Sequence, residues 1–246
     1  MEVALPACLM LALLTVLVLA DTPTSAPAWT TRADALWEKR DDPAAMKDLS
    51  ALLKDEMTAD PKSVEALVRK AMQQCWMADG MQDGSQLKAS LGKNCWETAD
   101  KAIALNPNEV RAQYWATVGI GLYSEGVGIL TALGEGLEGK FKERGQAAMR
   151  IDPEYLMGSP AMLMGRFFYK LPWPKRDLDK SLQLIESTVK AHPENLLAHV
   201  YYAATLDAVD RKAEAKQHLD LVLAAKAANP QDKRSQAKAQ KLLDKR

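Results

Sequence analysis

Apolar residues recur at helical spacing along most of the chain, and breaks that contain proline separate the runs. Five breaks share one form, in which an apolar run ends on Asp, Asn or His and a proline follows: Pro61, Pro107, Pro153, Pro193 and Pro230. A residue before proline is disfavoured in the α region, so each break ends one helix. Proline fits the first turn of the next helix, where its missing N–H costs nothing. The pattern predicts helical units of 46, 46, 40 and 37 residues between successive prolines.

Short polar side chains beside these prolines are expected to cap the helices that follow, because their oxygens accept hydrogen bonds from the free N–H groups of a first turn. The expected caps are Asp60, Asn106, Asp152 and Asn229. In the first unit, Asp42 is expected to cap the helix that begins at Pro43 in the same way.

Each unit divides into two helices, which we call helix A and helix B. In the last unit, residues 195–210 predict helix A and residues 211–230 predict helix B. Ala203 and Ala215 give these two helices small faces for a close approach. The matching small residues of earlier units are Ala71, Ala102, Thr117, Ala148 and Gly165. The prediction is an all-α protein, an α-solenoid of antiparallel helix pairs with about four to five repeats over residues 35–246 and a C-terminal capping helix.

Helix pairs that end in A-x-x-x-[DN]-P, with small residues where the helices cross, resemble tetratricopeptide repeats. A more specific resemblance covers roughly residues 35–223. It rests on "ALWEKRDDPAA", on Tyr114-Trp115, and on "IDPEYLMGSPAMLMGRFFYKLPWP" with the "DLDKSLQLIESTVKAHPENLLAHVYYA" that follows. Together these are similar to the exported T-component proteins of TRAP-type transporters. The resemblance implies a protein partner, the substrate-binding subunit of such a transporter, and leaves a hydrophobic small ligand and a homo-oligomer open.

The first twenty residues differ from the rest, because Val3 to Ala20 carries no charge and ends before a polar, proline-rich stretch. This predicts a signal peptide over residues 1–20, with cleavage after Ala20 or as late as Ala28, and an exposed linker over 21–34. The expected location is the periplasm. No Lys or Arg precedes the apolar run, so an uncleaved membrane anchor stays open. Cys8 lies before the apolar core "LMLALLTVLVLA" (residues 9–20) and not after it, so no lipobox is seen.

Cys75 and Cys95 are the cysteines that such a cleavage leaves. Cys75 lies one helical turn beyond Ala71, and Cys95 takes the small-residue position of helix B, so both should face the seam of one helix pair. An exported protein favours a disulfide between them, closing a long glycine-containing loop. Two buried free thiols are the alternative.

Charge and motifs indicate binding rather than catalysis. Lys plus Arg number 32 and equal Asp plus Glu, so no net charge points to nucleic acid. "GEGLEG" follows no strand and is expected to be a loosened helix or bend, not a dinucleotide site. A flexible wall around a ligand pocket is the alternative that stays open. The three histidines, His192, His199 and His218, are not spaced as metal ligands and are expected to face solvent or cap helices. We expect no enzyme activity, cofactor or metal.

Aromatic and arginine side chains on the A helices are the candidates for binding a partner or ligand. They are Arg69, Arg111, Tyr114, Trp115, Arg166, Tyr169 and Trp173. The arginines suit a carboxylate or phosphate, although each is equally suited to a salt bridge with a neighbouring repeat. Trp173 lies in "FYKLPWPKRD", a predicted connector in which Asp177 caps the next helix. We expect it to pack against helix ends, and an exposed anchor is the alternative.

The sequence predicts an exported helical repeat protein that acts by binding, and the T-component resemblance implies an accessory scaffold of a transporter. The second hypothesis is an adaptor for envelope assembly or peptide binding, unrelated to transport.

Overall fold

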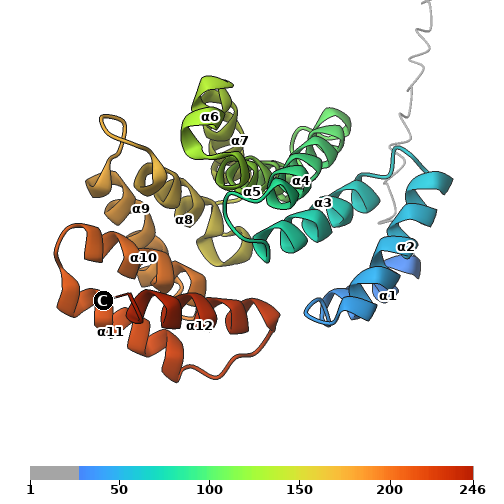
Figure 1. Ribbon diagram of the computed structural model, residues 1–246. Coiled ribbons are helices and arrows are strands. Elements are labelled where there is room, and N and C mark those ends of the chain that lie inside the picture. Colours follow the sequence, from blue (N-terminus) through green and yellow to red (C-terminus); the bar gives the residue numbers. More distant parts are fainter. Residues whose placement is uncertain (1–27, 246) are drawn as a thin grey trace, which may run out of the picture.

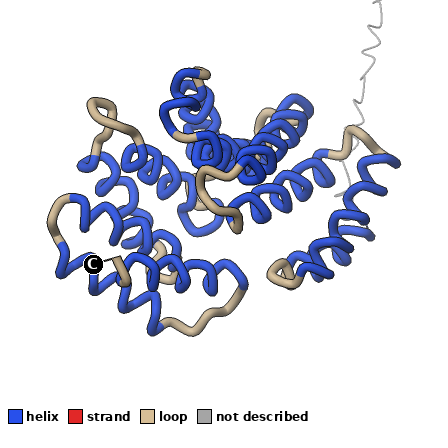
Figure 2. The backbone as a smooth tube through the Cα atoms, in the orientation of Figure 1, coloured by secondary structure: helices blue, strands red, loops and turns tan. Residues whose placement is uncertain are grey.

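The computed structural model describes residues 28–245, and these form helices joined by short loops, without a strand (Figure 2). In chain order the helices are α1 (Ala28–Trp37), α2 (Pro43–Ala59), α3 (Val64–Asp79), α4 (Gln86–Leu105), α5 (Val110–Val127), α6 (Ile129–Gly134), α7 (Leu137–Ile151), α8 (Tyr155–Lys170), α9 (Leu178–Ala191), α10 (Leu196–Ala208), α11 (Lys212–Ala224) and α12 (Pro230–Leu243).

The helices pack in pairs, and α12 follows the last pair. The pairs are α1 with α2, α3 with α4, α5 with α7, α8 with α9, and α10 with α11, and short α6 is an insertion in the third. Figure 1 shows the pairs following one another around an arc, with α12 and the turn between α1 and α2 facing each other across its opening. The predicted all-α solenoid is confirmed.

The proline breaks fall between units as expected, but most of the predicted caps act differently. Asn229 does cap α12, because its side chain accepts from the N–H groups of Gln231 and Asp232, and Asp42 likewise caps α2. Asp60, Asn106 and Asp152 instead end the preceding helices. Their side chains accept from the N–H two residues later, an Asx-turn that includes the proline. The helix therefore starts after this turn, at a cap such as Ser63.

The N-terminal boundary also differs from the prediction. The linker expected over residues 21–34 is helical from Ala28 onward, where Ala33 and Thr30 are buried in the contact between α1 and α2. The signal peptide, its cleavage sites and the alternative membrane anchor lie outside the described residues. Within residues 28–245 no helix combines the length and apolar character needed to cross a membrane.

Small residues let the helices approach closely, and the tightest contact is between α4 and α5. Ala71, Thr117 and Ala148 are fully buried, as predicted. The sequence reasoning missed three glycines, Gly92 on α4 with Gly119 and Gly126 on α5. A Cβ atom on Gly119 would lie 2.6 Å from the backbone nitrogen of Trp96, too close for any side chain. These glycines therefore let α5 lie directly against α4. Helix α5 carries much of the pocket described below.

The expected disulfide is present and joins α3 to α4. The sulfur atoms of Cys75 and Cys95 are 2.06 Å apart, and their Cα atoms are 5.4 Å apart. The long loop expected between them is mostly helical, because α3 continues to Asp79 and α4 begins at Gln86. The bridge therefore fixes one helix pair at its seam.

The connector between α8 and α9 has the predicted bounds, but its tryptophan was placed wrongly. α8 ends at Lys170, and Asp177 caps α9 through the N–H of Lys180. Trp173 is 88% exposed, so the expected packing against helix ends does not occur. Leu171, 4% exposed, supplies the buried side chain of the connector instead. The "GEGLEG" stretch is the expected bend, with Gly136 in the left-handed region between α6 and α7.

Candidate binding pocket on the concave side

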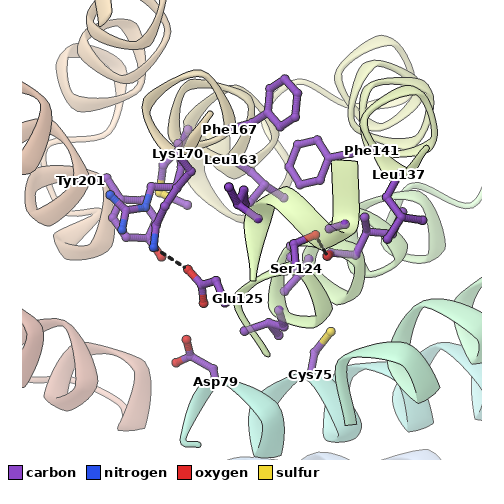
Figure 3. Close-up of a pocket in the computed structure, with 18 of the residues that line it drawn as sticks. Cys75, Asp79, Ser124, Glu125, Leu137, Phe141, Leu163, Phe167, Lys170 and Tyr201 are labelled. Carbon is purple, nitrogen blue, oxygen red and sulfur yellow. Dashed lines mark hydrogen bonds and ion pairs between the residues drawn. The ribbon is translucent and has the colours of Figure 1, made fainter. Parts of the chain in front are cut away.

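One pocket of about 170 Å³ lies on the inner side of the arc (Figure 3). Its lining comes from α3, α5, α8 and α10, which are A helices of four successive pairs, together with α6, α7 and α12. The pocket thus collects residues from positions 75 to 238 of the chain. No single repeat could form it alone.

Most of the wall is apolar. Its principal side chains are Trp115, Leu122, Leu133, Phe141, Leu163 and Phe167. Phe141 and Phe167 stack with ring centroids 4.6 Å apart, which joins α7 to α8. An apolar group that enters the pocket therefore leaves water for a preformed apolar surface.

An ion-paired carboxylate forms part of the opposite wall. Glu125 on α5 lies 3.0 Å from the ammonium nitrogen of Lys170 and 2.9 Å from that of Lys88. Burial by itself would raise the pKa of Glu125, but Lys170 and Lys88 outweigh it and lower the pKa to about 2. Figure 3 shows the contact with Lys170 at the edge of the apolar side chains. The carboxylate is therefore charged at neutral pH and already neutralised by its partners.

A second polar cluster joins α12 to α3 across the opening of the arc. Asp79 at the end of α3 lies 2.9 Å from Lys238 and 3.3 Å from Arg234. The guanidinium of Arg234 also lies over the ring of Trp76 and donates to the Trp76 carbonyl at 2.8 Å. Burial alone would lower the pKa of Lys238, whereas Tyr201 and Asp79 raise it, and the net pKa is raised. Lys238 and Asp79 both line the pocket, so these contacts also close it on one side.

Arg166 of α8 lines the pocket beside two tyrosines. Its guanidinium carbon lies 4.6 Å from the ring centroids of both Tyr169 and Tyr201. No carboxylate among residues 28–245 is within ion-pair distance of it, in contrast to Lys170 and Lys238. Its position is thus fixed by aromatic rings while its N–H donors stay available.

Residues 29–182, more than half of the chain, match the family profile described as regulator of microtubule dynamics protein 1-3. The chain belongs to this family. The matched part runs from α1 into α9 and includes α3 and α5–α8 of the pocket, whereas α10 and α12 lie beyond it. This family is different from the T-component family that the sequence resembles. The T-component resemblance therefore stays a prediction.

Among solved structures, the chain is similar to the crystal structure of MamA. The two are 16% identical in sequence, the match covers 84% of this chain and 95% of MamA, and the TM-score is 0.48. No curated protein matches the sequence of this family member.

The pocket of this family member includes some of the predicted binding residues and not others. Tyr114, Trp115 and Arg166 line it, and Tyr169 lies against Arg166 next to it. Trp173 lies on the exposed connector.

Two predicted arginines, Arg69 and Arg111, lie outside the pocket lining and share Glu65 as an ion-pair partner. Arg111 also pairs with Glu109, and hydrogen bonding by Glu109 is the main reason that the pKa of Arg111 is raised. For these two, the salt-bridge alternative is the one that the structure favours.

The sequence reasoning missed five charged residues of the pocket lining: Asp79, Glu125, Glu138, Lys170 and Lys238. For Glu125 a signal was available, because it stands alone in the long apolar run "ATVGIGLYSEGVGIL". An isolated charge on a buried helix needs a partner, and here it has two.

The histidines also differ from the prediction, because two of them meet. The Nδ1 atoms of His199 and His218 lie 2.8 Å apart, and His199 is only 3% exposed. Burial lowers the pKa of both side chains. Within residues 28–245 no group of three or more His, Cys, Asp or Glu side chains could hold a metal ion. This pair therefore joins α10 to α11 as a structural contact.

Proposed function

We propose that this member of the regulator of microtubule dynamics protein 1-3 family is a non-enzymatic binding scaffold. It holds a segment of a partner protein on its concave side, with one large apolar side chain of that segment in the pocket. The observation that carries the proposal is the pocket itself, which A helices of four successive pairs build from apolar side chains. Helical repeat arrays form extended concave surfaces of this kind for binding.

The volume of the pocket favours a side chain over a whole small molecule. A cavity of about 150 Å³ accommodates benzene, whereas pockets for drug-sized ligands span about 300–1,000 Å³. The observed 170 Å³ therefore suits one aromatic or branched side chain. The rest of the ligand would lie along the surface outside, as a polypeptide does.

The chemistry of the lining supports binding rather than catalysis. Among its charged side chains, Asp79, Glu125, Lys170 and Lys238 are committed to ion pairs with one another or with Lys88 and Arg234. Glu138 likewise pairs with Lys142 and Lys175, and the Arg166 guanidinium lies against two tyrosine rings. A catalytic group needs a partner arrangement that leaves it free to exchange a proton or attack a substrate. These groups stabilise the walls instead.

A peptide library displayed on phage and selected on the immobilised full chain tests the proposal. We expect enrichment of sequences with a single Trp, Phe or Leu in a polar context. Leu163→Trp fills the pocket and should abolish the enrichment. Leu221→Trp adds the same ring at an exposed position of α11 and should preserve it. Failure to enrich any sequence, or equal enrichment by Leu163→Trp, would refute the proposal.

A transporter accessory role is the second candidate function. It is favoured by the sequence resemblance to the T-component proteins, above all by "GRFFYKLPWPKRDLDK" (residues 165–180). It requires an exported, periplasmic protein whose partner is the substrate-binding subunit of a TRAP-type transporter. Isothermal titration of the purified subunit into this protein tests it. Micromolar binding that Leu163→Trp weakens would support it, and no heat at tens of micromolar would leave the adaptor for unrelated peptides as the better description.

A further inference from the structure

The side chains next to the pocket indicate which residues the bound segment carries beside its apolar anchor. This inference rests on the proposed function, because it concerns the same concave site. The relevant residues are Arg166 and Arg176 with the tyrosine between them in the sequence, Tyr169.

The two arginines differ from the nearby Lys170 and Lys175 in having no acidic partner. Lys170 is paired with Glu125, and Lys175 is paired with Glu138. Within residues 28–245 neither Arg166 nor Arg176 has a carboxylate within ion-pair distance, and both instead lie over the ring of Tyr169, at 4.6 and 4.9 Å from its centroid. Two positive charges without counter-charges are thus held against one aromatic ring at the pocket.

The position of Arg166 suits recognition of an anion. It lines the pocket, it is half-buried, and the rings of Tyr169 and Tyr201 hold its guanidinium. A guanidinium offers its N–H donors in a planar fork that matches a carboxylate, and a fixed fork loses little entropy when it binds.

We infer that Arg166 and Arg176 around Tyr169 form a subsite for acidic side chains, so that the bound protein segment carries Asp or Glu next to its large apolar residue. The apolar side chain enters the cavity between Phe141 and Leu163, and the carboxylate beside it meets Arg166 at the edge. Arg176, which is exposed on the connector, attracts a second acidic residue further along the segment.

Two matched peptides test the inference by fluorescence anisotropy. Each is a labelled heptapeptide with a central Trp, flanked by Glu in one peptide and by Gln in the other. We expect the full chain to bind the Glu peptide at least ~10-fold more tightly, which corresponds to about 1.4 kcal/mol. This preference should shrink as sodium chloride rises from about 50 mM to about 500 mM, because salt screens exposed charges.

Arg166→Gln should remove most of the preference, because it should lower the affinity for the Glu peptide far more than the affinity for the Gln peptide. Arg150→Gln, which removes the same charge from an exposed position at the end of α7, should leave the preference intact. Equal affinity for the two peptides in the wild-type chain would refute the acidic subsite and leave the apolar pocket standing. Loss of the preference in Arg150→Gln as well would refute it by showing general charge attraction.

Failure of both peptides to bind would overturn the proposed function together with this inference. Dodecanoate serves as a further probe, because it joins an apolar chain to a carboxylate without a peptide backbone. Tighter binding of dodecanoate than of the Glu peptide, lost in Arg166→Gln, would overturn the assignment of the subsite to a protein segment.

Discussion

Replacement of Gly119 by alanine tests whether the close contact between α4 and α5 sets the stability of the array. The new Cβ would lie 2.6 Å from the backbone nitrogen of Trp96 and 2.9 Å from the carbonyl oxygen of Gly92. Both are backbone atoms of α4, so no side chain can turn away. The two helices must separate by roughly 1 Å to reach ordinary contact, which opens gaps along the rest of their interface.

Two opposing terms give the size of the effect. Overpacking in a core costs about 1–3 kcal/mol, and alanine in a helix is about 1 kcal/mol more favourable than glycine. Because the obstacle is backbone, we take the upper part of the first range and expect a net loss of about 2 kcal/mol. For a chain of this length that loss lowers the melting temperature by roughly 4–8 °C.

Urea denaturation followed by circular dichroism measures the loss. Gly139→Ala is the matched control, because this α7 glycine has nothing within 4 Å of a built Cβ atom. The control should be as stable as the wild-type chain or more stable by up to about 1 kcal/mol. If Gly119→Ala proved as stable as Gly139→Ala, the idea that this crossing is at its packing limit would be wrong.

Four further predictions concern three residues of the pocket lining and the exposed Trp173. Asp79→Asn should lower the free energy of unfolding by about 1–3 kcal/mol in a urea titration, because its partly exposed partners lose their counter-charge. The control Asp220→Asn, on the exposed face of α11, should lower it by less than about 0.5 kcal/mol. The pKa of Glu125 is lowered from 4.5 to about 2 in the folded chain, so its contribution to stability is complete above about pH 5 and is lost as the pH falls through 2. Glu125→Gln should lower the free energy of unfolding by about 3 kcal/mol at pH 7. In calorimetry, the melting temperature of this variant should fall less between about pH 5 and about pH 2 than that of the wild-type chain. Reduction of the Cys75 bridge, which spans 20 residues, should cost about 3 kcal/mol in the chain-entropy model, and unchanged denaturation with reductant would contradict this. Trp173→Ala should leave the melting temperature within about 1 °C, since an exposed ring contributes little packing.

The sequence was sufficient for the parts of the fold that local rules govern. Proline restricts its own residue and the one before it, so the unit boundaries could be located from Pro61 or Pro107 without knowledge of the rest. Small residues at helical spacing likewise predicted crossings such as Ala203 with Ala215. The Asx-turns were misassigned because the same side chain can serve either the preceding turn or the following helix, and the backbone path decides which.

The pocket was harder to predict because it depends on the curvature of the array. Tyr114, Trp115 and Arg166 were found because aromatic and arginine side chains on A helices indicate a binding face. Asp79 and Lys238 were missed, since they are far apart in the sequence and meet only where the arc closes. Trp173 was misplaced because burial statistics for tryptophan say nothing about the direction in which a connector points.

The contact between α12 and α3 changes how the repeats share stability. In an open array each repeat touches only its nearest neighbours, so the ends fray independently and the total stability is a sum along a line. Here Lys238 of α12 meets Asp79 of the second pair across 159 residues of sequence, and Lys233 of α12 meets Asp41 between α1 and α2. The C-terminal end of the array therefore contacts its first two pairs. An end that opens must break contacts with both of its neighbours. The terminal repeats should therefore exchange their amide hydrogens as slowly as central ones do, and unfolding should be a single cooperative event rather than a progressive loss from either end.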